Sequence, residues 1–245
     1  MRIRSALSMV LALLPGLLGA TSCQGPVGRA TDTGRVETQE IINKRTPVLE
    51  QAQQKREDRT KELKAMDVPR LAQELATESQ QGNEPFNSLT FTEIVSRGET
   101  AADVLAPLIT KPDRSSLFAL LALRKMSPNR YKQLTSELRV DTLVDALKSS
   151  RYFNTWGLPH LHWEDAAKAL IEEGRATEKA LQVLLSDKRD APVWGGEDFA
   201  EYQRYKYRVC DYAWALLNEI RGQKITIPEN PVERDRLQKA AGGRG

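Results

Sequence analysis

The hydrophobic and polar positions of the chain follow a helical period over most of its length. Between residues 67 and 222, apolar residues recur three and four positions apart, which places them on one face of an α-helix. An extended run appears only at "ITIPE", residues 225–229. The pattern predicts an all-α domain over residues 67–222 and a tail over residues 223–245, with a short helix from Pro231 capped by Asn230.

Three of the predicted helices match one another along the sequence at a spacing of 38 residues. They lie in "VLAPLI" from Val104, "TLVDAL" from Thr142 and "ALQVLL" from Ala180. The coinciding positions are Leu105, Leu143 and Leu181, then Leu108, Ala146 and Leu184, then Ile109, Leu147 and Leu185. A recurrence of this length is typical of a repeat protein, in which each unit buries its apolar face against its neighbours.

A second helix follows each of these segments and has a shared pattern of its own. "DAAKALIEEG", residues 165–174, corresponds to "DYAWALLNEIRG", residues 211–222, and "SSLFALLALRKM", residues 115–126, is a looser copy. An earlier pair, "PRLAQELATE" and "SLTFTEIVSRG", starts the array. Three glycines are expected to end second helices in the left-handed conformation, namely Gly98, Gly174 and Gly222.

The phrase "LLSD", followed after a connection by "RVCDYAWALLNEI", resembles the HEAT repeat, whose second helix commonly shows Arg and alternating small and Leu positions. The resemblance covers residues 67–222. It implies a right-handed α-α superhelix of HEAT/armadillo-like helical repeats. By the habit of that family, it also implies a protein that binds other macromolecules.

The first twenty-two residues have the pattern of an export signal. "MRIR" supplies positive charge, and the apolar run "ALSMVLALLPGLL" that follows is too short to span a bilayer as a helix. Small residues then precede Cys23 in "GATSCQ". We expect residues 1–22 to be removed.

The stretch around Cys23 resembles the lipobox of bacterial lipoproteins, although Ala20 stands where that family usually has Leu. The resemblance implies that the Cys23 thiol receives a diacylglycerol group and that Cys23 becomes the new N-terminus. Gln24 rather than Asp follows, which in a cell with two membranes indicates the outer membrane, facing the periplasm. The alternatives are an ordinary cleaved signal and a disulfide between Cys23 and Cys210, the two cysteines of the chain.

Between this anchor and the repeats, the composition predicts two segments. Residues 23–35 are rich in Gly, Thr and charge and should form a flexible, lipid-anchored tether. Residues 36–66 are rich in Glu, Gln, Lys and Arg with few apolar positions, which predicts a charged, mostly exposed helix that Pro47 interrupts or kinks.

Charge alters the picture little. Without Arg2 and Arg4, the chain has 34 basic against 33 acidic side chains, and this balance favours neither nucleic acid nor an anionic surface as a partner.

Aromatic residues, by contrast, are concentrated in one part of the chain. Of fifteen Phe, Trp and Tyr residues, eleven lie between Tyr152 and Trp214. Many belong to two equivalent connections, "RYFNTWGLPHLHW" and "APVWGGEDFAEYQRYKY", which repeat geometry would place side by side. The candidate partner-binding residues are Tyr152, Phe153, Trp156, His160, His162, Trp163, Trp194, Phe199, Tyr202 and Tyr205. The alternative is that these aromatics fold back as a small satellite core.

Catalytic and metal chemistry have weaker support in the sequence. His160 and His162 share a face only in an extended segment, and Glu164 and Asp165 read as the start of the next helix rather than as metal ligands. Cys210 lies in an apolar helical run, where a small core residue is the usual explanation. No cofactor motif is present.

The leading hypothesis is a lipid-anchored scaffold or adaptor of the bacterial cell envelope that binds a protein partner, or an envelope glycan, through the aromatic loops. An enzyme with a site at His160 and His162 is one rival, and a purely structural envelope protein is another.

Overall fold

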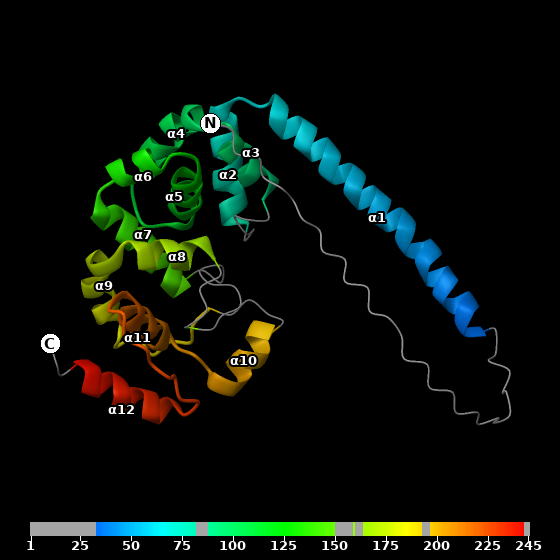
Figure 1. Ribbon diagram of the computed structural model, residues 1–245. Coiled ribbons are helices and arrows are strands. Elements are labelled where there is room, and N and C mark those ends of the chain that lie inside the picture. Colours follow the sequence, from blue (N-terminus) through cyan, green and yellow to red (C-terminus); the bar gives the residue numbers. More distant parts are fainter. Residues whose placement is uncertain (1–32, 82–87, 150–158, 160–163, 193–196, 243–245) are drawn as a thin grey trace, which may run out of the picture. The chain divides into compact units, whose positions relative to one another are not determined.

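The described part of the chain is built from helices, as the sequence predicts (Figure 1). The computed structural model describes residues 33–81, 88–149, 159, 164–192 and 197–242. The helices are α1 (Thr33–Ala65), α2 (Val68–Gln80), α3 (Leu89–Ser96), α4 (Glu99–Leu105), η2 (Ala106–Leu108), α5 (Arg114–Met126), α6 (Pro128–Gln133), α7 (Ser136–Ser149), α8 (Asp165–Glu172), η3 (Gly174–Thr177), α9 (Glu178–Leu184), α10 (Glu197–Tyr205), α11 (Val209–Ile220) and α12 (Pro231–Gly242). The only pairing of β type among these residues is an isolated bridge between Asp190 and Arg208.

The chain divides into two compact units, residues 1–51 and residues 52–245. In the first unit, α1 continues through Pro47, so of the predicted interruption or kink the interruption is wrong. Proline removes one hydrogen bond of the helix, and at an exposed position water can take its place. Val48 and Leu49 are also exposed, at 65% and 67% of their surface.

In the second unit, the remaining turns of α1 are charged and largely exposed until the helix ends. Gln53 donates to Glu57 at 3.0 Å and Gln54 to Asp58 at 2.9 Å, which are pairs four residues apart of the kind that support a helix. Only its end is covered, because Leu63 is buried in the core of the unit.

Eight of the described helices of the second unit contact one another as four pairs along the chain: α2 with α3, α4 with α5, α7 with α8, and α9 with α11. Each pair also packs on the next one. The main contacts between successive pairs join α2 to α5, α5 to α7, and α7 to α9, and α11 also contacts α7 and α8 (Figure 1). Short helices thus bury their apolar faces mainly against neighbours that are close in sequence.

Most of the matching positions of the 38-residue recurrence lie in the core. Leu105, Leu143 and Leu181 are 1%, 0% and 0% exposed on α4, α7 and α9. Leu108 differs from its counterparts Ala146 and Leu184, because it is 54% exposed. It lies in the 3-10 turn η2, which winds with three residues per turn and therefore moves this position off the apolar face.

The three glycines end their helices as predicted. Gly98, Gly174 and Gly222 have φ angles of 61°, 59° and 69°, the left-handed region that glycine adopts without strain. Each stands two residues after the last residue of a second helix, α3, α8 or α11. The same stop thus recurs in the same place.

Several boundaries differ from the prediction. α10 lies in a segment that the sequence pattern assigns to a connection, α6 was not predicted, and α1 begins at Thr33, inside the expected tether. The start of α8 at Asp165 is confirmed, as is the tail helix α12. Asn230 accepts a hydrogen bond from the Val232 amide at 2.8 Å, which is the predicted cap.

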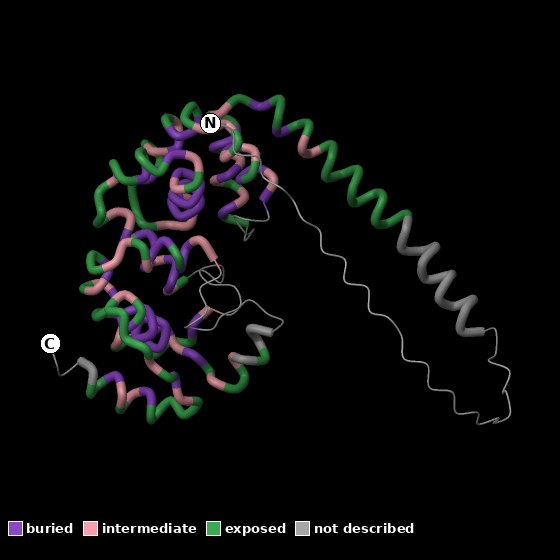
Figure 2. Tube along the Cα trace, in the orientation of Figure 1, coloured by how far each residue is buried: buried purple, intermediate pink, exposed green. Residues whose placement is uncertain are grey.

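The core is densest at α5 and α11 (Figure 2). Eight consecutive residues of α5, 116–123, and ten of α11, 209–218, are buried. A helix that is covered on all sides lies between other layers rather than on the surface. The second helices of these two pairs therefore form the interior of the unit.

A buried polar cluster joins α6, α7 and the end of α8. Glu173 accepts hydrogen bonds from Arg139 at 2.8 and 2.9 Å and from the Tyr131 hydroxyl at 2.7 Å. The Arg139 guanidinium also lies 5.1 Å from the centre of the Tyr131 ring. Burial alone would raise the pKa of Glu173, but the hydrogen bonds from Arg139 and Tyr131 outweigh it, and the pKa lies below its ordinary value.

We expect Glu173→Gln to lower the free energy of unfolding by about 2–4 kcal/mol at pH 7, because it leaves the Arg139 charge buried without its counter-ion. Since the pKa of Glu173 is lowered in the folded protein, its contribution is complete above the unfolded pKa and is lost as the pH falls through the folded one. The difference from wild type should therefore shrink below about pH 4.

Urea unfolding at several pH values measures this difference. Glu172→Gln is the matched control, since Glu172 pairs with Arg124 while its own side chain is 62% exposed, and its loss should cost below about 1 kcal/mol. Equal effects of the two substitutions would contradict a special role for Glu173.

Candidate functional site

Most of the predicted binding residues lie outside the described part of the chain. This holds for Tyr152, Phe153, Trp156, His160, His162, Trp163 and Trp194, and for the predicted lipidation site Cys23. The side chain of Phe199 on α10 is likewise not described. The structure therefore places two of the predicted binding side chains, Tyr202 and Tyr205.

Tyr202 and Tyr205 both lie on α10, one helical turn apart. The Tyr202 hydroxyl donates to Asp190 at 2.9 Å, and this hydrogen bond raises the pKa of Tyr202. Tyr205 is half-buried and stacks on Tyr207, with ring centres 5.0 Å apart. Tyr205 thus belongs partly to the packing of the protein, whereas Tyr202 lies nearer to the surface.

The stack continues into α11. The Tyr207 ring meets the ring of Tyr212 edge to face at 6.0 Å, and both residues are buried. The Arg234 guanidinium, which comes from α12, lies 5.4 Å from the centre of the Tyr207 ring. Tyr207 and Tyr212 belong to the main hydrophobic core, and Tyr205 packs against it. These three tyrosines therefore have a structural role in the main core and do not form a separate satellite core.

A cluster of charged residues next to this aromatic stack is centred on Asp211, which is fully buried. Its carboxylate accepts from the Arg208 side chain at 3.0 and 3.1 Å and from the Arg208 backbone amide at 2.9 Å. Gln238 donates to it at 2.9 Å, and Arg234 lies 3.3 Å away as an ion pair. The backbone contact caps the N-terminus of α11, so one carboxylate serves both the helix end and the cluster.

Asp235 extends the cluster to the surface. It accepts from Lys188 at 2.6 Å and from Arg208 at 2.9 Å, and these two hydrogen bonds lower the pKa of Asp235. The carboxylates of Asp211 and Asp235 raise the pKa of Arg208. Every charged side chain of the cluster is thus paired with an opposite charge. This arrangement suits a structural role, in which the cluster holds α11 and α12 together.

Cys210 lies beside this cluster, with Sγ 3.8 Å from an oxygen of Asp211. Its side chain is fully buried, and burial together with the Asp211 charge raises the pKa of the Cys210 thiol to about 11. A thiol of this kind is neutral near pH 7 and enclosed, which suits a core residue and not a nucleophile. The interpretation of Cys210 as a core cysteine agrees with this environment.

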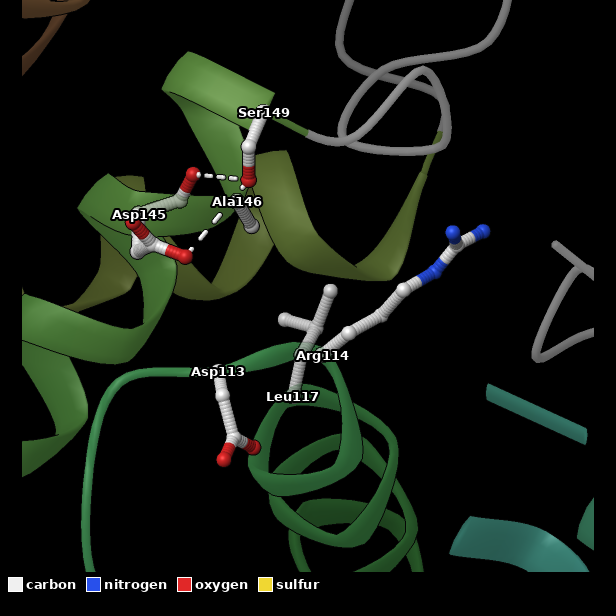
Figure 3. A pocket seen from close by; sticks show the side chains of 6 residues that line it. All are labelled: Asp113, Arg114, Leu117, Asp145, Ala146 and Ser149. Atoms are coloured by element: carbon white, nitrogen blue, oxygen red, sulfur yellow. Dashed lines mark hydrogen bonds between the residues drawn. The ribbon is translucent and has the colours of Figure 1, made fainter. Parts of the chain in front are cut away.

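A shallow hollow lies between α5 and α7, lined by Asp113, Arg114, Leu117, Asp145, Ala146 and Ser149 (Figure 3). Its two carboxylates have local partners. Asp113 caps α5 by accepting from the Ser116 amide at 2.8 Å, and Asp145 lies 3.4 Å from Lys148. Figure 3 shows the Arg114 guanidinium pointing away from both carboxylates, so the hollow does not gather these groups around one point.

Other kinds of site were sought in the same residues. Across the ranges that the structure describes, no group of three or more His, Cys, Asp and Glu side chains could hold a metal ion. No helix in the described part is both long and apolar enough to cross a membrane.

The sequence pattern missed the cluster around Asp211, although one signal was present. Asp211 is a lone carboxylate inside the apolar run "VCDYAWALL", where a buried charge needs a partner. Arg234 and Gln238 are four residues apart in the tail, the spacing that places both on one face of a helix. Nothing in the sequence says that these two features meet.

No protein-family model, curated protein or solved structure matches this chain. The function is therefore inferred from the residues and contacts of the chain itself.

Proposed function

We propose that the protein is a lipid-anchored scaffold or adaptor of the bacterial cell envelope. In this proposal, residues 67–222 form a HEAT-like right-handed superhelix, and a partner protein binds at the aromatic connections. The observation that carries the proposal is the 38-residue recurrence in the sequence, whose equivalent leucines Leu105, Leu143 and Leu181 are all buried. Arrays of such pairs present extended surfaces to which macromolecules bind.

The anchor rests on the sequence around Cys23. A basic start, a short apolar run and small residues before a cysteine are the parts of a lipoprotein signal. The exposed, largely charged and polar stretch of α1 over residues 47–58 is compatible with a segment that stands in water between an anchor and a folded domain. In this proposal the protein is exported, and its repeats face the periplasm from the outer membrane.

The binding surface is proposed at α10 together with the tryptophan-containing connections. α10 carries Tyr202, whose hydroxyl is bound only to an exposed carboxylate, Asp190, among the described residues. A tyrosine of this kind has an apolar ring and a polar tip, the combination common in protein interfaces. The stacking of Tyr205 on Tyr207 would hold α10 in a fixed position on the core.

We expect Cys23→Ala to move the protein from the membrane fraction to the soluble fraction of the cell, because the substitution removes the thiol that would receive the lipid. Fractionation followed by immunoblotting measures this, and labelling with a radioactive fatty acid tests the modification itself. Cys210→Ala is the matched control and should stay with the membrane. A Cys23→Ala protein that remains membrane-bound would contradict the anchor.

Chemical cross-linking in intact cells tests the adaptor role. A partner captured by the wild-type protein should be lost from a variant that combines Trp156→Ala, Trp194→Ala and Tyr202→Ala, because the aromatic anchors are gone. Val183→Ala is the control, since Val183 is an exposed apolar residue on α9. Digestion of the captured material by protease or by glycan-cleaving enzymes tells a protein from a glycan.

Recovery of the same partner by the triple variant would mean that the aromatic connections only complete the fold.

A further inference from the structure

Arg234 is the feature of the structure that the proposed function leaves unexplained. It lies on α12, whose neighbouring residues Val232 and Glu233 are exposed, yet its own side chain is fully buried. Burial of an arginine has a high desolvation cost unless its donors find acceptors. Both Nη atoms of Arg234 donate hydrogen bonds, Nη1 to the Pro228 carbonyl at 3.2 Å. The Nε atom has no hydrogen-bond partner among the described residues and lies 3.3 Å from Asp211. The position of its acceptors therefore indicates what the residue does.

Arg234 donates to backbone carbonyls at the end of α10. Its Nη2 atom bonds the carbonyl of Tyr205 at 2.8 Å and that of Lys206 at 3.4 Å. Tyr205 is the last residue of α10, where carbonyl groups lack partners within the helix. A cation at this end also interacts favourably with the helix dipole. Arg234 lies on α12, 29 residues after Tyr205 in the sequence, and thus caps the C-terminal end of α10.

The turn after α10, whose carbonyls accept from Arg234, has a strained backbone. Lys206 has a φ angle of 48°, and it is the only residue other than glycine with a positive φ in the described part of the chain. A left-handed lysine needs external support, because its Cβ crowds the backbone. The carbonyl contacts of Arg234 and its position over the Tyr207 ring supply that support on both sides of Lys206.

Asp211 holds Arg234 in place from the other side. Its carboxylate pairs with Arg234 and also accepts from Gln238, one helical turn further along α12. Asp235 adds bonds to Lys188 and Arg208. Of the two large apolar residues of α12, Val232 is 73% exposed and Leu237 packs partly buried against the core, so polar contacts supply much of the attachment of α12.

We propose that α12 is a positioning element for the partner-binding segment, and that Arg234 transmits its effect by fixing the C-terminal end of α10. The proposal rests on the proposed function, in which α10 carries part of the binding surface. Binding at α10 and docking of α12 are then coupled. A partner that orders α10 also strengthens the attachment of α12, and release of α12 weakens binding.

Hydrogen–deuterium exchange of the full chain, without any partner, tests the link between α12 and α10 on which this coupling depends. In Arg234→Ala, amides of α10 should exchange at least tenfold faster than in wild type, while those of α5 keep their wild-type rates. Arg236→Ala is the matched control, since Arg236 is an exposed arginine on the same helix, and α10 should keep its protection there.

Arg234→Lys decides the matter even if the alanine variant unfolds. Lysine keeps a positive charge near Asp211 but has no planar fork with which to reach the carbonyls of α10. We expect faster exchange in α10 with most protection retained in α12. Unchanged exchange in α10, in this variant or in a folded Arg234→Ala, would overturn the proposal.

The exchange measurement contains no partner, so it stands apart from the test of the adaptor role. Coupling without capture would refute the proposed function alone, and capture without coupling would refute the positioning role alone.

Discussion

The structure depends on one constraint, which is that its short helices cannot exist alone. From α2 onward none of the described helices exceeds fourteen residues, and helices of this length are marginal in water. Each must bury an apolar face, and the faces available are those of the neighbouring pairs. The leucines at Leu105, Leu143 and Leu181 meet this need at equivalent places. Buried ion pairs such as Arg139 with Glu173 add direction to contacts that apolar packing leaves unspecific.

The same constraint explains the two ends of the second unit, where a helix pair has no further pair to cover it. At the start, the last turn of α1 supplies Leu63 to the core, and Arg97 donates to the Lys64 carbonyl at 2.9 Å. At the end, α12 attaches through Arg234 and Asp211. In the proposed array of helix pairs, terminal elements need a polar outer face for solubility. The end formed by α12 differs, because α12 is attached through charged side chains. These side chains also link the tail to α10.

The sequence predicted what local pattern controls. The helical class, the glycine stops at Gly98 and Gly174, the start of α8 and the cap at Asn230 each follow from a few adjacent residues. It failed where two signals competed. Pro47 predicted an interruption or a kink, but the exposed helix α1 continues through it. The segment with Phe199, Tyr202 and Tyr205 was predicted to be a connection, although these residues have helical spacing and lie on α10.

The candidate site was predictable only in part, for a physical reason. Aromatic content identified the connection that includes α10, since such residues are counted directly along the chain. The contacts of Arg234 with Asp211 and with the end of α10 join residues more than twenty positions apart. Charged residues have no periodic signature that names their partners, so a buried joint of this kind becomes visible only in the folded chain.

Native-state hydrogen exchange of Leu143→Ala tests the central claim, an array of helix pairs stabilised by its neighbours, most directly. The substitution opens a cavity in α7 and should cost about 3 kcal/mol there. The account predicts that protection falls most in α7, less in the adjoining α5, α8 and α9, and stays near wild type in α2 and α3. An equal loss of protection in every helix would contradict it, because that is the behaviour of one undivided core.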